Sequence, residues 1–287
     1  MPAFKRDAPL APLDVRGSTF AWGSRTYIMG VINATPDSFS GDGTGDDVDR
    51  AVEQARAFAQ AGCDIIDIGG ESTRPGYSPV SESIERARVI PVIKGVRATT
   101  DLPISIDTFK PSVAGAALEA GADMLNCVWG AMPGIIGIAA ATAAPLIIMH
   151  NRAKAEYEGD VVAEVIESLE RDAGDAIAAG CKAERIIVDP GIGFGKTAEH
   201  NIEILGRLLE FVARLHHPLL VGTSRKSFIG KITGLPVDQR VFGTAASVAL
   251  AIASGADIVR VHDVAAMRGV VDVADAICRG SLRAARV

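Results

Sequence analysis

The polar residues most suggestive of chemistry follow an apolar run in the first third of the chain. Residues 64–76 read DIIDIGGESTRPG, so isoleucine and aspartate change abruptly to glycine, charge and hydroxyl. Paired glycines allow a sharp turn and a close approach of the backbone to a ligand. Ligands of parallel α/β folds bind beyond the carboxyl ends of the strands. Taken alone, however, this loop fits equally well an ordinary helix start capped by Ser72 or Thr73.

Cations gather in two later stretches. Arg225 and Lys226 lie in a Gly-Thr-Ser-Arg-Lys-Ser-Phe run, and Arg260 and His262 lie two residues apart. Small residues, hydroxyls and cations together suit an oxyanion, and barrels commonly seat phosphate groups after their last two strands. If Ser227 begins a helix, its backbone N–H and the helix dipole would favour the same ligand. An isolated Arg-Lys pair is usually a solvated surface pair, but two such stretches favour an anion site.

Hydrogen-bond acceptors form a third group. Asp107, Asn126 and Asp189 each follow an apolar run. Carboxylates and a carboxamide that converge suit a ligand with several N–H donors, such as an aminopyrimidinone. Metal binding is the competing interpretation, but hard cations usually need more convergent oxygens than can be assigned here. Residues 191–196 (GIGFGK) lack the spacing of a phosphate loop, and we predict a turn.

Eight apolar runs, each ending in polar residues, organise the chain. They cover residues 27–32, 65–68, 104–106, 124–125, 146–149, 186–188, 219–221 and 258–259. Segments with the 3.6-residue period of a helix lie between them, such as 48–59 and 161–177. We therefore predict an α/β fold, a single-domain (β/α)8 TIM barrel with its site at the strand ends. An open doubly wound sheet would need a glycine-rich turn after the first strand, which residues 33–36 (NATP) do not provide.

The ends of the chain, its charge and its cysteines set further limits. Residues 1–17, with three prolines, predict a flexible N-terminal extension, and residues 18–287 the barrel, with a hairpin around 18–26 closing its bottom. The net charge of −6 argues against general nucleic-acid binding. Glycine and proline interrupt the uncharged segment 127–149, which predicts a buried helix and strand rather than a membrane span. Four cysteines without metal-type spacing suit a reducing cytoplasm.

Seven motifs, in chain order, resemble those of the dihydropteroate synthases, a pterin-binding family. They are residues 33–40 (NATPDSFS), 67–76 (DIGGESTRPG), 106–108 (IDT), 149–150 (MH), 189–191 (DPG), 224–227 (SRKS) and 260–262 (RVH). The resemblance runs from about Phe20 to Ala276. It implies a folate-biosynthesis transferase that joins 6-hydroxymethyl-7,8-dihydropterin diphosphate to 4-aminobenzoate and releases diphosphate. It also implies Mg²⁺, a cytoplasmic homodimer, and inhibition by sulfonamides, with neither nucleic acid nor membrane as a partner.

The resemblance assigns roles to residues that match the family's motifs. Asn33 would ligate the magnesium ion, and the diphosphate would be bound by Thr73, Arg260 and His262. The pterin would be held by Asp107, Asn126, Asp189 and Lys226, of which Asp107, Asp189 and Lys226 are the catalytic candidates. Ser227 would receive the aminobenzoate carboxylate. Two loops would close over the site, and their matching residues are Thr35, Asp37, Ser38, Arg74 and Pro75.

The implied chemistry is a dissociative, SN1-like substitution. An arylamine is already neutral near pH 7, so the harder task is expelling diphosphate, which cations can stabilise. Asp107 and Asp189 would favour the positive charge that develops on the pterin. One position departs from the family, because Cys127 follows Asn126 where Asp is usual. Side chains alternate along a strand, so we expect Cys127 to point away from the site, toward the helix layer or the following loop.

Two alternatives to synthase activity are open from the sequence. A related pterin-binding barrel occurs in corrinoid-linked methyltransferases, which also present Asp and Asn to a folate. The stretches 35–39 (TPDSF) and 224–227 (SRKS) favour the synthase. A non-catalytic pterin-binding homologue should have lost the diphosphate-binding residues, yet Asn33, Thr73, Lys226, Arg260 and His262 are all present.

Overall fold

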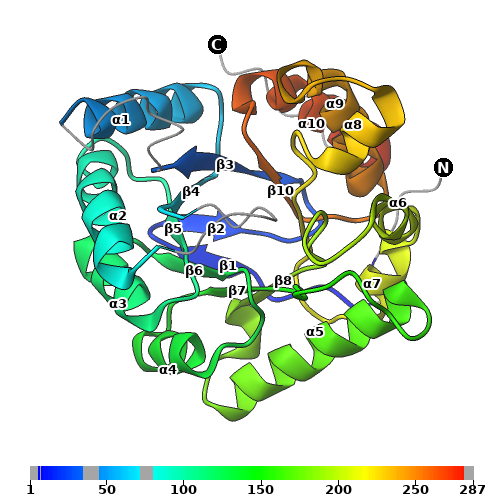
Figure 1. Ribbon diagram of the computed structural model, residues 1–287, viewed down its shortest axis with the longest axis horizontal. Helices are drawn as coiled ribbons and strands as arrows, with labels where there is room; N and C mark the ends of the chain where they lie inside the picture. The colour runs from blue at the N-terminus through cyan, green and yellow to red at the C-terminus, as the bar shows by residue number, and fades with distance from the viewer. Residues whose placement is uncertain (1–5, 7, 35–44, 72–79, 281–287) are drawn as a thin grey trace.

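The fold is a ring of parallel strands surrounded by helices (Figure 1). The computed structural model describes residue 6 and residues 8–34, 45–71 and 80–280. Eight parallel strands form one sheet in the order β8-β7-β6-β5-β4-β3-β10-β9. An isolated bridge between Val188 and Leu219 links its two ends, so the sheet is nearly closed. The strands are β3 (Tyr27–Asn33), β4 (Ile65–Gly69), β5 (Ile104–Asp107), β6 (Met124–Cys127), β7 (Leu146–Met149), β8 (Ile186–Asp189), β9 (Leu220–Val221) and β10 (Ile258–Val261).

Helices alternate with these strands and cover the outside of the ring (Figure 1). They are α1 (Gly45–Gln60), α2 (Glu82–Arg97), α3 (Pro111–Ala120), α4 (Pro133–Thr142), α5 (Val161–Ala178), α6 (Ala198–Gly206), α7 (Leu208–Arg214), α8 (Ser227–Thr233), α9 (Val241–Ala253) and α10 (Val264–Arg279), with 3-10 turns η1 (Ala183–Arg185) and η2 (Val237–Gln239). The predicted single-domain (β/α)8 barrel is confirmed. Residues 127–149 contain α4 and the buried strand β7, as predicted. In the described part of the chain, no helix is long and apolar enough to cross a membrane.

Alternation along the strands produces two separate apolar clusters. One side of each strand packs against the helices, as Ile66 and Ile68 of β4 do. The other side forms an inner cluster, which contains Tyr27, Met29, Ile65, Met124, Ile147, Ile187, Leu220 and Ile258. Inward positions nearer the carboxyl ends of the strands include the polar residues Asp67, Asp107, Asn126, Asp189 and Arg260. The barrel interior is therefore a packed apolar layer below a polar layer.

A small hairpin completes the inner cluster. Strand β1 (Leu13–Val15) pairs antiparallel with β2 (Ser18–Phe20), and Leu13, Val15 and Phe20 pack on the inward strand residues. The predicted hairpin exists, but it begins earlier than residue 18. Residues 13–17 therefore belong to it and not to a loose extension, because the apolar side chains at 13 and 15 can be buried in the barrel.

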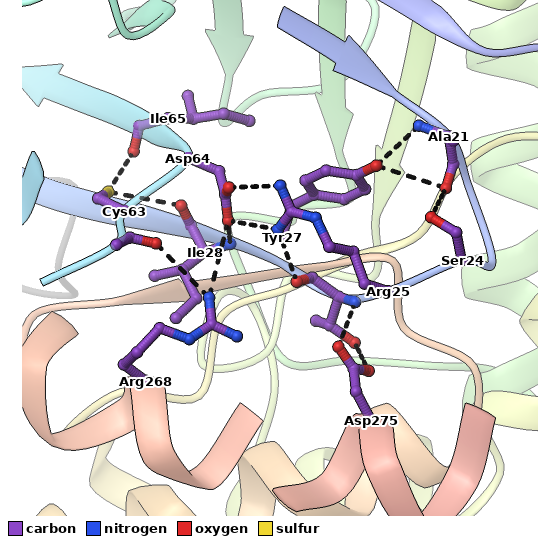
Figure 2. Close-up of polar contacts among 12 residues, drawn as sticks. Ala21, Ser24, Arg25, Tyr27, Ile28, Cys63, Asp64, Ile65, Arg268 and Asp275 are labelled. Atoms are coloured by element: carbon purple, nitrogen blue, oxygen red, sulfur yellow. Dashed lines mark hydrogen bonds and ion pairs between the residues drawn. The ribbon is translucent and has the colours of Figure 1, made fainter. Parts of the chain in front are cut away.

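The amino ends of the strands share a repeated device. Three of them are preceded by a Gly-Ala-Asp or Gly-Cys-Asp triplet, in which each glycine has a positive φ. The aspartates accept a backbone N–H of a neighbouring strand: Asp64 from Ile28 at 2.8 Å, Asp123 from Ile104 at 2.9 Å and Asp257 from Leu219 at 2.9 Å. Each also pairs with an arginine, and Figure 2 shows the pair of Asp64 with Arg25. These contacts tie the strands together at the end opposite the polar layer.

Candidate functional site

An arginine held between two carboxylates lies at the centre of the polar layer. Arg260 of β10 donates from Nε to Asp67 Oδ2 at 2.7 Å and from Nη2 to Asp107 Oδ2 at 2.8 Å. Asn126 of β6 donates from Nδ2 to the same Asp67 oxygen at 3.1 Å. Four strands therefore contribute to one hydrogen-bonded group. The sequence predicted that Asp107 and Asn126 converge and placed Arg260 in a separate cationic group, and the structure brings all three together.

This group leaves acceptor oxygens for a ligand. Asp67 Oδ1 and Asp107 Oδ1 are buried and have no hydrogen-bond partner in the part of the chain that the structure describes. Burial raises the pKa of the Asp107 carboxyl to about 7, although the Arg260 guanidinium acts to lower it and the Asp67 carboxylate adds to the rise. A buried acceptor without a donor is costly, so both oxygens suit a ligand that brings N–H groups.

A second pair, Asp189 and Lys226, lies on the other side of the barrel mouth. Asp189 ends β8 and accepts the Gly191 backbone N–H through Oδ1 at 2.7 Å. Burial raises the pKa of the Asp189 carboxyl, against the lowering effect of Lys226. Removal from water lowers the pKa of the Lys226 ammonium to about 7, and Asp189 acts to raise it. Lys226 donates to the carbonyl of Ile192, and its Nζ lies 4.4 Å from the ring centre of Phe194.

The predicted cationic group is only partly formed. The ring Nδ1 of His262 lies 3.0 Å from Ser224 Oγ, which also accepts the His262 backbone N–H at 3.2 Å. Arg225, by contrast, pairs with Asp263, so its charge is already partnered. Its backbone has φ +58°, a region that residues other than glycine rarely occupy. Ser227 is the first residue of α8, as predicted, and it is exposed.

Asn33 lies in the part of the chain that the structure describes, whereas the predicted loop residues do not. Asn33 ends β3 beside Gly69, which in turn pairs with Asp107. Thr35, Asp37, Ser38, Thr73, Arg74 and Pro75 lie outside the described residues. Within the described ranges, no group of three or more His, Cys, Asp or Glu side chains could hold a metal ion. A carboxamide oxygen is nevertheless a hard ligand, and Mg²⁺ is often held by one or two protein oxygens together with substrate phosphates. Asn33 supplies one such oxygen donor at the end of β3.

Cys127 points away from the site, as expected from strand alternation. Its side chain is fully buried in the outer cluster between strands and helices. Burial raises the pKa of its thiol to about 11, so it stays protonated near neutral pH. All four cysteines are free. Cys127 therefore contributes packing and no reactive thiolate.

Three site residues received no role from the sequence. Asp67 shares its inward direction with Ile65, so strand alternation could have placed it in the polar layer. His150 is buried beyond β7, and Lys196 donates to its Nδ1 at 2.8 Å. No periodic signal indicates Lys196, because it lies in an irregular loop whose path depends on positive-φ glycines.

Comparison with known proteins agrees with this geometry. Residues 29–262 match the family model of pterin binding enzymes. The chain is 50% identical over 277 residues to a dihydropteroate synthase of Synechocystis sp., with coverage of 93% of this chain and 96% of the relative. It is 42% identical to that of Bacillus subtilis, with coverage of 92% and 93%.

Solved structures of dihydropteroate synthases also superpose closely on this chain. A dihydropteroate synthase of Clostridium difficile, determined in the presence of pteroic acid, superposes with a TM-score of 0.88 at 45% identity and covers 91% of this chain and 99% of its own. That of Xanthomonas albilineans in complex with 7,8-dihydropteroate superposes with a TM-score of 0.84 at 41% identity, covering 93% and 98%. A Yersinia pestis structure with a sulfonamide drug complex has a TM-score of 0.87 at 36% identity, covering 94% and 100%.

Proposed function

This chain belongs to the pterin-binding enzymes and, within them, to the dihydropteroate synthases, and we propose from that premise how its site carries out their reaction. It is a folate-biosynthesis transferase that condenses 6-hydroxymethyl-7,8-dihydropterin diphosphate with 4-aminobenzoate to 7,8-dihydropteroate and diphosphate. The observation that carries the assignment is the polar layer of buried acceptors around Arg260. Neither the corrinoid-linked methyltransferase nor the non-catalytic alternative is retained, since the relatives are synthases.

The buried acceptors and one ammonium recognise the pterin. An aminopyrimidinone presents N–H donors on one edge, and the second oxygen of Asp189 accepts from them. Asn126 and Asp107 Oδ1 serve the opposite side of the bicyclic ring. Lys226 donates to the ring's acceptor atoms. Support for this arrangement is that these groups converge at one end of the barrel and that the acceptor on Asp107 lacks a protein donor among the described residues.

The cations receive the diphosphate. Asp67 and Asp107 engage two of the three nitrogens of Arg260, and the third, Nη1, donates to the leaving group. His262, held by Ser224, is the second donor. We assign Thr73 to the same role and Ser227 to the aminobenzoate carboxylate, both from the family's motifs. The loops carrying Thr35, Asp37, Ser38, Arg74 and Pro75 close over the site in this proposal.

We propose that Mg²⁺ takes part in this reaction and that Asn33 would hold it together with the bound substrate. When bound, it would supply positive charge to stabilise the departing diphosphate. The chain itself positions the ester oxygen through Arg260 and His262. Cytoplasmic location is likewise proposed from the four free cysteines, which suit a reducing compartment.

The substitution is dissociative. The bond between the pterin methylene and the ester oxygen breaks, and the electron pair leaves with diphosphate. The resulting cation lies close to the carboxylates of Asp107 and Asp189, which favour it electrostatically. The neutral amine of 4-aminobenzoate then forms the new C–N bond and loses a proton. No general base is needed, because the ammonium group that forms with the new C–N bond is acidic and loses its proton readily.

An isotope effect tests this course. With deuterium on the reacting methylene, a dissociative transition state gives a normal secondary isotope effect on kcat/KM, because the carbon becomes trigonal. Direct displacement by the amine would leave the ratio near one and would contradict the proposal. Formation of dihydropteroate in the same assay tests the activity itself.

The protein forms a homodimer through helices α8, α9 and α10, which lie together in Figure 1. Exposed apolar side chains gather on them and on the segment joining α8 to α9: Ile232, Leu235, Val237, Phe242, Leu250, Val273 and Ile277. Phe242 is 83% exposed and Ile277 is 76% exposed, which is unusual for such residues on a monomer. A second copy related by a two-fold axis would cover both faces with the same residues.

A further inference from the structure

The loop between β8 and α6 encloses a lysine that has no role in the chemistry above. Lys196 donates from Nζ to His150 Nδ1 at 2.8 Å and to the Phe194 carbonyl at 3.1 Å. The His150 carbonyl lies 3.5 Å from the same nitrogen. All of these acceptors belong to the residue that follows β7 or to the loop itself. A lysine committed to three internal acceptors serves structure or positioning rather than solvation.

The loop adopts its path only because of its glycines. Gly191, Gly193 and Gly195 have φ values of +68°, +83° and +55°, a region that other residues rarely occupy. A side chain on Gly193 would come within 2.8 Å of Lys226 Cδ. Asn201 of α6 accepts the Gly193 backbone N–H at 2.6 Å. The loop is thus shaped closely around the side chain of Lys226.

The ammonium group of Lys226 makes two described contacts with this loop. Its ammonium donates to the carbonyl of Ile192, and it lies 4.4 Å from the ring centre of Phe194. Phe194 in turn supplies the carbonyl that Lys196 holds. A continuous set of contacts therefore leads from the end of β7 through Lys196 and Phe194 to Lys226.

His150 is suited to anchor this set. Burial, together with the positive charge of Lys196, lowers the pKa of the imidazole to about 3, so the ring is neutral at physiological pH. A neutral ring that accepts at Nδ1 carries its proton on Nε2. It therefore offers Lys196 a fixed acceptor on a rigid strand end.

We propose that Lys196 is a positioning residue for pterin binding, which fastens the 191–196 loop to His150 and so holds Lys226 in place beside Asp189. The inference rests on the proposed function of Lys226. Lys196 touches no substrate in this account and acts only through the loop.

A double-mutant cycle tests the inference. The dissociation constant of 6-hydroxymethyl-7,8-dihydropterin diphosphate is measured by calorimetry for the wild type, Lys196→Met, Lys226→Met and the double variant. We expect Lys196→Met to weaken binding by about ten- to a hundredfold, within the range of couplings between contacting residues. The double variant should bind within about threefold of Lys226→Met alone, because Lys196 has nothing left to position.

The remaining outcomes are equally decisive. A double variant weakened by the product of the two single effects, or a Lys196→Met variant that binds like the wild type, would overturn the inference. A wild type that does not bind the pterin would instead contradict the proposed function. Lys182→Met, an exposed lysine near the opposite end of the barrel, is the control and should bind normally. If Lys196→Met does not fold by circular dichroism, Lys196→Gln replaces it and the same criterion applies.

Discussion

The protonation states of two side chains govern the expected pH dependence. In the proposed arrangement, pterin binding requires an ionised Asp107 and a protonated Lys226, and removal from water moves the pKa of each to about 7. The pKa of the carboxyl is raised, so activity is lost as pH falls through 7. The pKa of the ammonium is lowered, so activity is lost as pH rises through 7. We therefore expect a narrow, bell-shaped pH profile of kcat/KM that is centred near neutrality.

Lys226→Arg separates the two limbs of that bell. A guanidinium stays protonated throughout the accessible range, so the basic limb should move to higher pH while the acidic limb stays. Profiles of kcat/KM between about pH 5.5 and 9.5 measure both limbs. A basic limb unchanged in Lys226→Arg would show that another group causes it.

Asp189→Asn tests the pterin contact most simply. The amide keeps the shape of the side chain but can place a donor against a donor of the pterin, and the variant also loses a negative charge near the reacting carbon. We expect kcat/KM to fall by about 2 to 4 kcal/mol, roughly a thirtyfold to thousandfold loss. A folded Asp189→Asn enzyme of nearly normal activity would place the pterin elsewhere. Asp101→Asn, an exposed aspartate before the amino end of β5, serves as the control.

At the scale of elements, hydrophobic patterning was sufficient to predict the barrel. All eight apolar runs became strands, and Asp107, Asn126, Asp189 and Arg260 end up in one layer because they share inward positions at strand ends. The conformations of irregular segments could not be predicted from hydrophobic patterning. The side chain of Arg225 pairs with Asp263 and its backbone takes a positive φ, and no periodicity encodes either feature.

Contacts between residues far apart in the chain could not be predicted from the sequence. Lys196 and His150 are 46 residues apart, and their pairing depends on how β7 and β8 lie side by side. The hairpin β1-β2 was placed several residues too late, because its short strands gain stability only from packing inside the barrel. Both features follow from tertiary structure and leave no local pattern.

The aspartates at the amino ends of the strands should contribute stability without catalysis. Asp64 accepts two hydrogen bonds from Arg25, at 2.7 and 3.0 Å, and one from the Ile28 backbone (Figure 2). Asp64→Asn removes the charge and can set a donor against these donors, so we expect a loss of about 2 to 4 kcal/mol in the free energy of unfolding. The kcat/KM of the folded variant should be unchanged, because the substitution lies at the other end of the barrel.

Denaturant unfolding and kinetics on the same sample measure the two effects. Glu170→Gln is the matched control, because Glu170 also pairs with an arginine, Arg214, at 2.8 Å but is 39% exposed at the side chain. It should cost no more than about 1 kcal/mol. An Asp64→Asn variant of normal stability would show that the strand ends do not depend on this pair.

At the scale of the whole molecule, the exposed apolar face predicts self-association. Leu250→Ser and Ile277→Ser together remove two large exposed side chains from α9 and α10, and neither is needed for the fold of a monomer. The wild type should have the mass of a dimer in light scattering after size exclusion, and the double variant should shift toward the monomer. A wild type that is monomeric at micromolar concentration would contradict the proposed interface.

The barrel as a whole is organised to bind a pterin diphosphate and release diphosphate as the C–N bond forms, and product stoichiometry tests that claim most directly. The wild-type protein is incubated with 6-hydroxymethyl-7,8-dihydropterin diphosphate, 4-aminobenzoate and Mg²⁺, and dihydropteroate and diphosphate are both quantified over time. We expect equal amounts of the two products, and we expect both to be lost when the metal is chelated. Tight pterin binding with no formation of either product, or diphosphate release without dihydropteroate, would contradict it.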